Sequence, residues 1–388
     1  MSYELKTLGT VAQYINGRAF KPNEWEKEGI PIIRIQNLNN TSAKYNYSSK
    51  TYEDKFLIQR GDLLFAWSAS LGAHIWKGDS AWLNQHIFKV IPNTDVDRDY
   101  LYYYLLKVVA ELYQKAHGTG MVHITKKPFM ATAIPVPELK IQKQIVQQIE
   151  EQLSQLDSAV ETLKKTKQQL EVYRQAVLKE AFNRVVDVSQ IIPIKDVCKD
   201  IKVGIVIKPS QYYTEQNNGI KAFRSANVRE FNVNDSDWVY LTKEGNEQNK
   251  RSEIHTDDVL IVRSGYPGTA CVVPEKYNGC NAIDILIAVP NTDVINSEYL
   301  CAYTNSPYGR QSVREKKRGV AQAHLNVGGY SKIKIIVPNL DVQKEVVKSI
   351  KEKLSQCSYI ENTVNQSLQQ AEVLRQSILK KAFEVNKF

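Results

Sequence analysis

Arginine, asparagine and serine side chains recur at matching places in two halves of the chain. The stretch GIPIIRIQNL at 29–38 matches GIKAFRSANV at 219–228, and GDLLFAWSASLG at 61–72 matches DDVLIVRSGYPG at 257–268. A guanidinium can bind a phosphate through two parallel hydrogen bonds, and hydroxyl and amide groups can also donate to phosphate. The shared residues are therefore candidates for phosphate contacts, with local ion pairs and turns as the alternatives: Arg34 and Arg224, Asn37 and Asn227, Ser68 and Ser264.

Net charge and composition favour a soluble protein with a polyanionic partner. The chain has 51 Lys and Arg against 42 Asp and Glu, and its net charge of +9 favours nucleic acid, although many basic proteins bind none. A length of 388 residues suggests two or more domains. The apolar run at 101–110 is too short to span a bilayer, no secretory signal is visible, and the five cysteines form no CxxC motif. We therefore expect a cytoplasmic protein with free thiols.

The elements that position these side chains include a long repeated segment. RQAVLKEAF at 174–182 returns as RQSILKKAF at 375–383, and about 23 of the 53 positions in 134–186 are identical in 335–387 without a gap. Each copy lacks Pro and Gly beyond its opening prolines, and its apolar residues recur at alternating steps of three and four. This pattern predicts two long helices that pair through a heptad seam.

Each predicted seam contains a charged residue. Lys167 interrupts the first and Glu361 the second. If the helices pair antiparallel, with the N-terminus of one against the C-terminus of the other, these charges come within about one helical turn. Such a pair can fix the register of a coiled coil, and solvated charges at the seam edge are the alternative.

A mixed block of short strands and helices precedes each long helix, at 1–133 and 187–334. Runs such as IPIIRI and HIFKVI are rich in β-branched residues and predict strands, whereas residues 97–116 predict a helix. The order is thus block, helix, block, helix, which gives an α+β protein with an internal pseudo-twofold repeat. That symmetry suits duplex DNA, whose backbone is itself twofold.

Positions at which the two blocks differ are candidates for base recognition, because blocks that bind different sequences need different side chains. Arginine can bind guanine, and glutamine can bind adenine, through paired hydrogen bonds in the major groove. For Trp67 the alternative is packing in the core, and for the lysines near the long helices it is a solvated charge run. The candidates are Gln36 opposite Ala226, Trp67 opposite Arg263, and Ser70 opposite Tyr266, with Lys44, His74, Lys126, Lys127, Arg229, Lys317 and Arg318 in addition.

Motifs for catalysis are missing from the sequence. There is no GxxxxGK[ST] phosphate loop, no GxGxxG after a strand, no NPPY-like segment for methylation of a flipped base and no GxSxG elbow. His117 and His123 have no cysteine or carboxylate at metal-ligand spacing. We therefore predict no catalytic residues and no metal site.

In this arrangement the whole chain resembles the specificity (S) subunit of type I restriction–modification systems. The resemblance rests on the block and helix order, on VPxL followed by QK at the start of each helix, and on RQ[AS][VI]LK[EK]AF at its end. The R-x-x-N and DxL...S...G stretches of each block also fit. It implies target recognition domains at 1–139 and 187–340, with spacer helices at 140–186 and 341–388 forming an antiparallel coiled coil.

The resemblance also implies a function and partners. Each domain would recognise one half of a bipartite site in double-stranded DNA, and the non-catalytic chain would bind two methyltransferase (M) subunits and motor–nuclease (R) subunits. The chain itself would bind no cofactor, whereas its partners would use S-adenosylmethionine, ATP and Mg. A non-specific coiled-coil scaffold and a stand-alone hydrolytic enzyme are the rival functions.

The repeated helix ends are candidates for partner binding. Each end carries an arginine and a bulky phenylalanine, and an exposed apolar patch often marks a docking site. The candidates are Arg174, Phe182, Arg375 and Phe383, and packing of both phenylalanines within the chain is the alternative.

Overall fold

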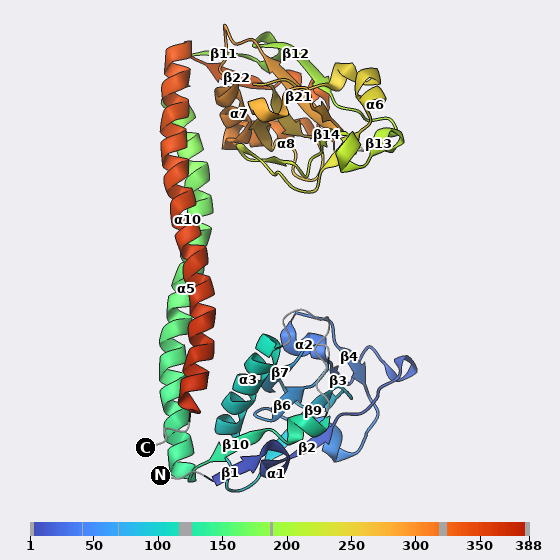
Figure 1. The fold of residues 1–388 in the computed structure, drawn as a ribbon, viewed down its shortest axis with the longest axis vertical. Helices are drawn as coiled ribbons and strands as arrows, with labels where there is room; N and C mark the ends of the chain where they lie inside the picture. The colour runs from blue at the N-terminus through green and yellow to red at the C-terminus, as the bar shows by residue number, and fades with distance from the viewer. Residues whose placement is uncertain are drawn as a thin grey trace. The chain divides into compact units, whose positions relative to one another are not determined.

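The chain divides into two compact units. The computed structural model describes residues 4–40, 42–68, 70–115, 126–186, 189–317 and 324–384 (Figure 1). The first unit comprises Met1–Leu163 and Asn365–Phe388, and the second comprises Lys164–Val364. Each unit therefore contains one α/β domain, which we call the first or second domain, and a part of both long helices. This division cuts through the helices instead of following their ends.

Two four-stranded sheets and a two-stranded ribbon form the first domain. Its strands are β1 Glu4–Thr7, β2 Ala12–Asn16, β3 Ile30–Ile33, β4 Asn46–Ser48, β5 Leu57–Ile58, β6 Leu63–Ala66, β7 Gly72–Ile75, β8 Ala81–Leu83, β9 Ile87–Pro92 and β10 Ala133–Val136. The main sheet has the antiparallel order β2-β9-β6-β7. The second has the order β4-β3-β8-β5, with β3 and β8 parallel. The ribbon pairs β1 with β10 and brings the start and end of the domain together.

The second domain repeats this plan. Its strands are β11 Gln190–Pro193, β12 Cys198–Val203, β13 Tyr213–Thr214, β14 Ile220–Phe223, β15 Val228–Arg229, β16 Asn232–Val233, β17 Val239–Leu241, β18 Val259–Val262, β19 Ala270–Val272, β20 Asn281–Ala282, β21 Ile285–Pro290 and β22 Lys334–Val337. The main sheet is β12-β21-β18-β19, the second sheet is β13-β17-β14-β20, and β11 pairs with β22. A short hairpin, β15-β16, is added.

The helices surround these sheets and connect the domains. In the first domain they are α1 Leu8–Val11, α2 Ile35–Asn39, α3 Arg98–Lys115 and α4 Lys126–Met130. In the second they are α6 Lys243–Gln248, α7 Ser297–Asn305, α8 Pro307–Lys317 and α9 Val327–Ser331. The long helices are α5 Leu139–Asn183 and α10 Leu340–Ala382. Where the first domain has the single helix α3, the second has α7 and α8, because Pro307 cannot continue a helix.

Continuous apolar runs form the central strands because both faces of the main sheet are covered. In β6, Leu63 and Phe65 pack into one core with α3 and the long helices, whereas Leu64 and Ala66 pack into another core with the second sheet. Side chains alternate across a strand, so every residue of such a strand can be apolar. The run VLIV of β18 divides between two cores in the same way.

The glutamine of each QK motif fastens the start of a long helix to its own domain. Gln142 accepts a hydrogen bond from the amide of Asp97 (2.7 Å), and Gln343 accepts one from the amide of Asn296 (2.8 Å). Each glutamine also donates to the proline carbonyl of its VPxL motif, at 2.7 and 2.8 Å. Both side chains are buried. The repeated motif therefore performs the same structural task in each unit.

Within each unit α5 and α10 pack side by side and antiparallel (Figure 1). The ion pair that the structure shows for Glu361 is one that the sequence did not predict. Glu361 pairs with Arg174 (3.0 Å), two helical turns beyond Lys167 along α5, and the same guanidinium donates to Ser358 Oγ (3.1 Å). A long side chain with several donors can satisfy both groups, which favours this register.

The phenylalanines at the helix ends are core residues. The prediction that they form an exposed apolar patch is wrong, because each ring is buried in an aromatic cluster of its own unit. The ring centroids lie 5.1–5.2 Å apart in edge-on pairs: Phe182 with Tyr299 and Tyr303, and Phe383 with Tyr100 and Tyr104. Such pairs add to the stability gained by burial alone.

We predict that Phe383→Ala destabilises the first unit and Phe182→Ala the second. Each change leaves a cavity in a packed core, with an expected cost of about 3–5 kcal/mol in unfolding free energy. Hydrogen exchange should accelerate around Tyr100 in the first variant and around Tyr299 in the second. Val373→Ala is the control, because that side chain is two-thirds exposed. Acceleration in the opposite unit would contradict the prediction.

Candidate nucleic-acid interface

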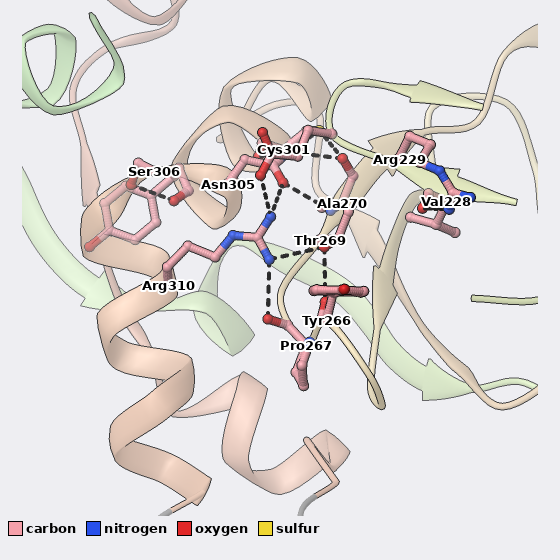
Figure 2. A network of polar contacts seen from close by, with 12 residues as sticks. Val228, Arg229, Tyr266, Pro267, Thr269, Ala270, Cys301, Asn305, Ser306 and Arg310 are labelled. Atoms are coloured by element: carbon pink, nitrogen blue, oxygen red, sulfur yellow. Dashed lines mark hydrogen bonds and ion pairs between the residues drawn. The ribbon is translucent and has the colours of Figure 1, made fainter. Parts of the chain in front are cut away.

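A cleft of about 1170 Å³ in the second unit gathers several of the candidate residues. Its walls come from β15, the loop after β18, α8 and one residue of α5. Ala226, Arg229, Ser264 and Tyr266, all candidates from the sequence, line it. We call it the second-unit cleft, and Figure 2 shows several of the residues that line it, among them Val228, Arg229 and Tyr266.

The loop after β18 displays Tyr266 at this cleft. Gly265 and Gly268 have φ angles of +74° and +85°, which favour glycine. A Cβ on Gly268 would also lie 3.1 Å from Val313, so the loop is closely packed on α8. Tyr266 is 84% exposed, whereas Ser264 bonds to His324 Nδ1. The fold therefore holds an aromatic side chain in solvent on a tightly constrained loop.

The two shared asparagines are loop braces. Asn37 is 2% exposed; it accepts from the amide of Arg34 (3.1 Å) and donates to the carbonyl of Lys44 (3.2 Å). Asn227 is 0% exposed and makes the matching bonds to Arg224 (3.0 Å) and Ser236 (2.9 Å). Both asparagine side chains are buried and form hydrogen bonds with backbone groups of their own domain. The prediction that they contact DNA is therefore corrected: their role is structural.

The two shared arginines have different surroundings. Arg224 donates to the carbonyl oxygen (2.6 Å) and to the carboxylate (3.1 Å) of Asp237, which is the ion pair that the sequence left as an alternative. Arg34 lies over the ring of Trp25, with its guanidinium carbon 5.4 Å from the ring centre. Both side chains are half-buried.

Trp67 and Arg263 occupy one structural position and form different cross-strand pairs. Trp67 follows β6 and its ring lies 5.4 Å from that of His86, which precedes β9. Arg263 follows β18 and donates to the carboxylate of Asp284 (2.6 Å), which precedes β21. The residues thus differ in pairs: an aromatic contact in one sheet is replaced by an ion pair in the other. Packing within each sheet is therefore sufficient to explain why these two residues differ.

The remaining candidates divide by exposure. Gln36, Lys44, Lys127 and Arg229 are exposed, and Ser68 is half-buried. His74 lines a cleft of about 710 Å³ in the first unit with Asn37, and burial lowers the pKa of its imidazole, which favours the neutral ring. Arg318, His123 and the side chains of Lys126 and Lys317 lie outside the part of the chain that the structure describes.

Groups suited to other chemistry are not assembled in the described ranges. Among those residues no three His, Cys, Asp or Glu side chains are placed to hold a metal ion, and no helix is long and apolar enough to cross a membrane. Burial raises the pKa of the Cys271 thiol to about 12, and the other four cysteines are also unpaired thiols.

Comparison with known proteins identifies the family. The model described as "Type I restriction modification DNA specificity domain" matches residues 2–172 and again residues 188–370. The chain belongs to this family. It is 26% identical over 401 residues to the EcoBI specificity subunit of Escherichia coli, covering 97% of this chain and 84% of that protein. It is 23% identical over 383 residues to the MjaVIII specificity subunit of Methanocaldococcus jannaschii, covering 90% and 85%.

Solved structures show the same fold. A chain from a type I restriction–modification system, studied for its complex assembly and conformational transition, matches with a TM-score of 0.76 and 17% identity, covering 99% of this chain and 98% of that one. The HsdS subunit of Thermoanaerobacter tengcongensis matches with a TM-score of 0.55 and 18% identity, covering 99% and 97%.

Arg310 of the second specificity domain was missed by sequence reasoning. It comes from α8, lines the second-unit cleft and forms an ion pair with Glu230 (2.7 Å). The aligned stretches of the two domains do not include it, and no motif marks it. Only the basic run to which it belongs, RQSVREKKR at 310–318, could have pointed to this helix.

Each long helix exposes a pair of apolar side chains one or two residues before its predicted arginine. Val172 and Tyr173 are 72% and 49% exposed, and the matching Val373 and Leu374 are 67% and 50% exposed. Arg174 and Arg375 themselves bind Glu361 and Asp157 of the facing helix. The repeat thus presents a similar apolar pair to solvent in each unit, Val–Tyr in the second and Val–Leu in the first.

We predict that Asn227→Ala lowers the stability of the second unit, whereas Arg229→Ala weakens DNA binding. The buried asparagine leaves backbone groups unsatisfied, so unfolding of the second unit should become easier by about 1–3 kcal/mol. The exposed arginine should leave stability within about 0.5 kcal/mol while weakening DNA binding. Thermal unfolding and DNA titration at fixed salt measure both quantities. A stable Asn227→Ala protein with lost DNA binding would restore the asparagine as a direct contact.

Proposed function

We propose that this chain is the DNA-specificity subunit of a type I restriction–modification complex, in which each unit binds one half of a bipartite duplex site. One observation carries the proposal. The chain contains two specificity domains of matching topology, and the side chains at equivalent surface positions of the two domains differ. Gln36 in the first domain corresponds to Ala226 in the second, and Ser70 to Tyr266. Similar frames with different surfaces suit two different half-sites.

Phosphate contacts would provide affinity and base contacts specificity. Among the described side chains, the exposed Lys44, Lys127 and Arg229 are the best placed for phosphates, and Tyr266 for bases. Arg34, Arg224 and Arg263 could join them only by sharing or releasing their present contacts. Direct recognition would therefore fall on loop tips more than on the ends of the central strands.

The chain itself would be non-catalytic. Methyl transfer from S-adenosylmethionine would belong to two methyltransferase subunits, and ATP- and Mg-dependent translocation and cleavage to motor–nuclease subunits. The family assignment and the absence of recognised catalytic motifs in the sequence support this division. The long helices would both separate the domains and bind the methyltransferases.

For methyltransferase docking, the repeated apolar pairs replace the buried phenylalanines as our candidates. Glu180 of α5 forms an ion pair with Lys353 of α10 (3.8 Å), and Tyr173 and Ile360 each lie seven residues from these partners toward the middle of the helices. Residues seven apart share one helix face, so Tyr173 and Ile360 lie on the same flank of the pair. Tyr359 and Ile360 are also exposed, whereas Ser158 and Ala159 stand at the matching positions of the first unit. The second unit would therefore offer the larger apolar surface.

Modularity provides the test of DNA recognition. Replacing residues 1–133 with the matching block of a relative should change one half-site and leave the other unchanged, because each domain has its own sheets and core. Mapping of methylated adenines in cells that also express the methyltransferase measures the outcome. A hybrid that alters both half-sites would contradict independent recognition, and methylation without sequence preference would favour a non-specific scaffold.

We predict that Val172→Ser combined with Tyr173→Ser weakens methyltransferase binding by about tenfold or more, since loss of a buried apolar anchor typically has such an effect at interfaces. Glu171→Ser is the matched control, because this neighbour is exposed and polar. Titration of the purified partner measures binding, and thermal unfolding confirms that both variants are folded. Equal affinity for the double variant and the control would place docking elsewhere.

A further inference from the structure

Arg310 joins four groups around the second-unit cleft. Its guanidinium donates to the carbonyl of Pro267 (3.1 Å) and to the hydroxyl of Thr269 (3.0 Å) through Nη1. Through Nη2 it donates to Asn305 Oδ1 (3.2 Å) and to the carboxylate of Glu230 (2.7 Å). Figure 2 shows the side chain reaching from α8 into this network.

These contacts connect two segments that carry candidate DNA-binding residues. Pro267 directly follows the exposed Tyr266, and Thr269 Oγ1 donates to the carbonyl of Tyr266 (2.8 Å). Glu230 directly follows the exposed Arg229. One half-buried guanidinium therefore sets where both segments lie relative to α8.

Asn305 anchors the network in the core. It is fully buried and accepts a hydrogen bond from the amide of Ala270 (3.0 Å) as well as from Arg310. The guanidinium is thus held on one side by a fully buried residue of α7, and it can hold the loop in one position.

Tyr113 of α3 makes the corresponding contact in the first unit. Its hydroxyl accepts a hydrogen bond from the amide of Leu71 (3.0 Å). Leu71 follows β6 in the stretch that matches the loop after β18, and it stands at the position of Pro267. In both units a long side chain from the helices that follow the main sheet therefore holds the same loop.

The two residue types follow from the loop sequences. Leu71 offers an N–H, so an acceptor such as the tyrosine hydroxyl can bind it. Proline has no N–H, so at this position the loop of the second unit offers only a carbonyl, and its partner must be a donor. Arginine supplies several donors in a fixed plane, which lysine cannot reproduce.

We propose that Arg310 and Tyr113 are positioning residues for base recognition, each setting the loop that its own domain presents to DNA without contacting DNA itself. This inference rests on the proposed function. It predicts that a change at either residue alters the base preference of one half-site only. Neither residue was a candidate from the sequence, because their link to the loops exists only in the folded domains.

The test uses the full chain with its methyltransferase on two duplex libraries. One library fixes the first half-site and randomises the second, and the other reverses this. The unchanged protein must first select two defined half-sites; failure at that step overturns the proposed function and this inference with it. Sequencing of methylated products then gives the base preference of each variant.

Arg310→Lys should reduce the preference for the correct second half-site about tenfold or more, while leaving the preference at the first unchanged. Tyr113→Phe, which removes one hydrogen bond, should reduce preference at the first half-site about two- to tenfold and leave the second unchanged. Gln311→Ala is the control on α8, because this side chain is exposed and bonds to Glu315 of its own helix (2.9 Å).

A purely structural role would give a different result. Arg310→Lys would then lower the melting temperature and total methylation but keep the same base preference at the second half-site, and this outcome overturns the proposal. If Arg310→Lys does not fold, Glu230→Gln decides instead, because it weakens one contact and keeps an acceptor. Its base preference at the second half-site should shift in the same direction, and an unchanged preference overturns the proposal.

Discussion

The burial of a phenylalanine at the end of each long helix is the contact on which both units depend. Phe182 packs edge-on against two tyrosines of α7, and Phe383 packs in the same way against two tyrosines of α3. Each contact joins a domain to the helix that ends beside it, whereas the glutamine of the QK motif joins the same domain to the helix that begins there. A domain is thus held at two points by two different helices, and the antiparallel pairing follows from satisfying both.

The two domains contain parts whose packing fixes their shape, namely the central strands and the buried asparagines, and loops whose sequence can vary. The central strands are buried on both faces, and the asparagine braces are committed to backbone groups. The loops after β6 and β18 lie outside the buried strands and are free of these packing requirements. They differ in sequence, yet each is fixed by one side chain from outside the sheet. A rigid sheet with replaceable, individually fastened loops is a suitable design for a protein that must recognise different sequences with one fold.

Much of this architecture follows from sequence because its signals are local or repeated. The runs LLFA and VLIV predict buried strands, the absence of Pro and Gly predicts helices as long as α5, and a shift of 201 positions aligns the two copies. Contacts between distant side chains do not have such signals. The partner of Glu361 was not predicted because each seam offers more than one polar position, and the structure pairs this carboxylate with Arg174. The pairs Trp67 with His86 and Arg263 with Asp284 likewise become visible only when β6 and β9, or β18 and β21, lie together.

The assembly of the first unit from two remote segments has a consequence for synthesis. Its core combines Ile149 and Leu153 with Leu379 and Phe383. Between these segments lie the 201 residues of Lys164–Val364, which take about 10–40 s to translate at roughly 5–20 residues per second. During that interval the first domain has part of its apolar surface uncovered, and the whole second unit is synthesised before Leu379 and Phe383 are. In the growing cell, the first domain to be made is therefore the last to have its core completed, and it is the part of the chain for which a chaperone has the longest time to act.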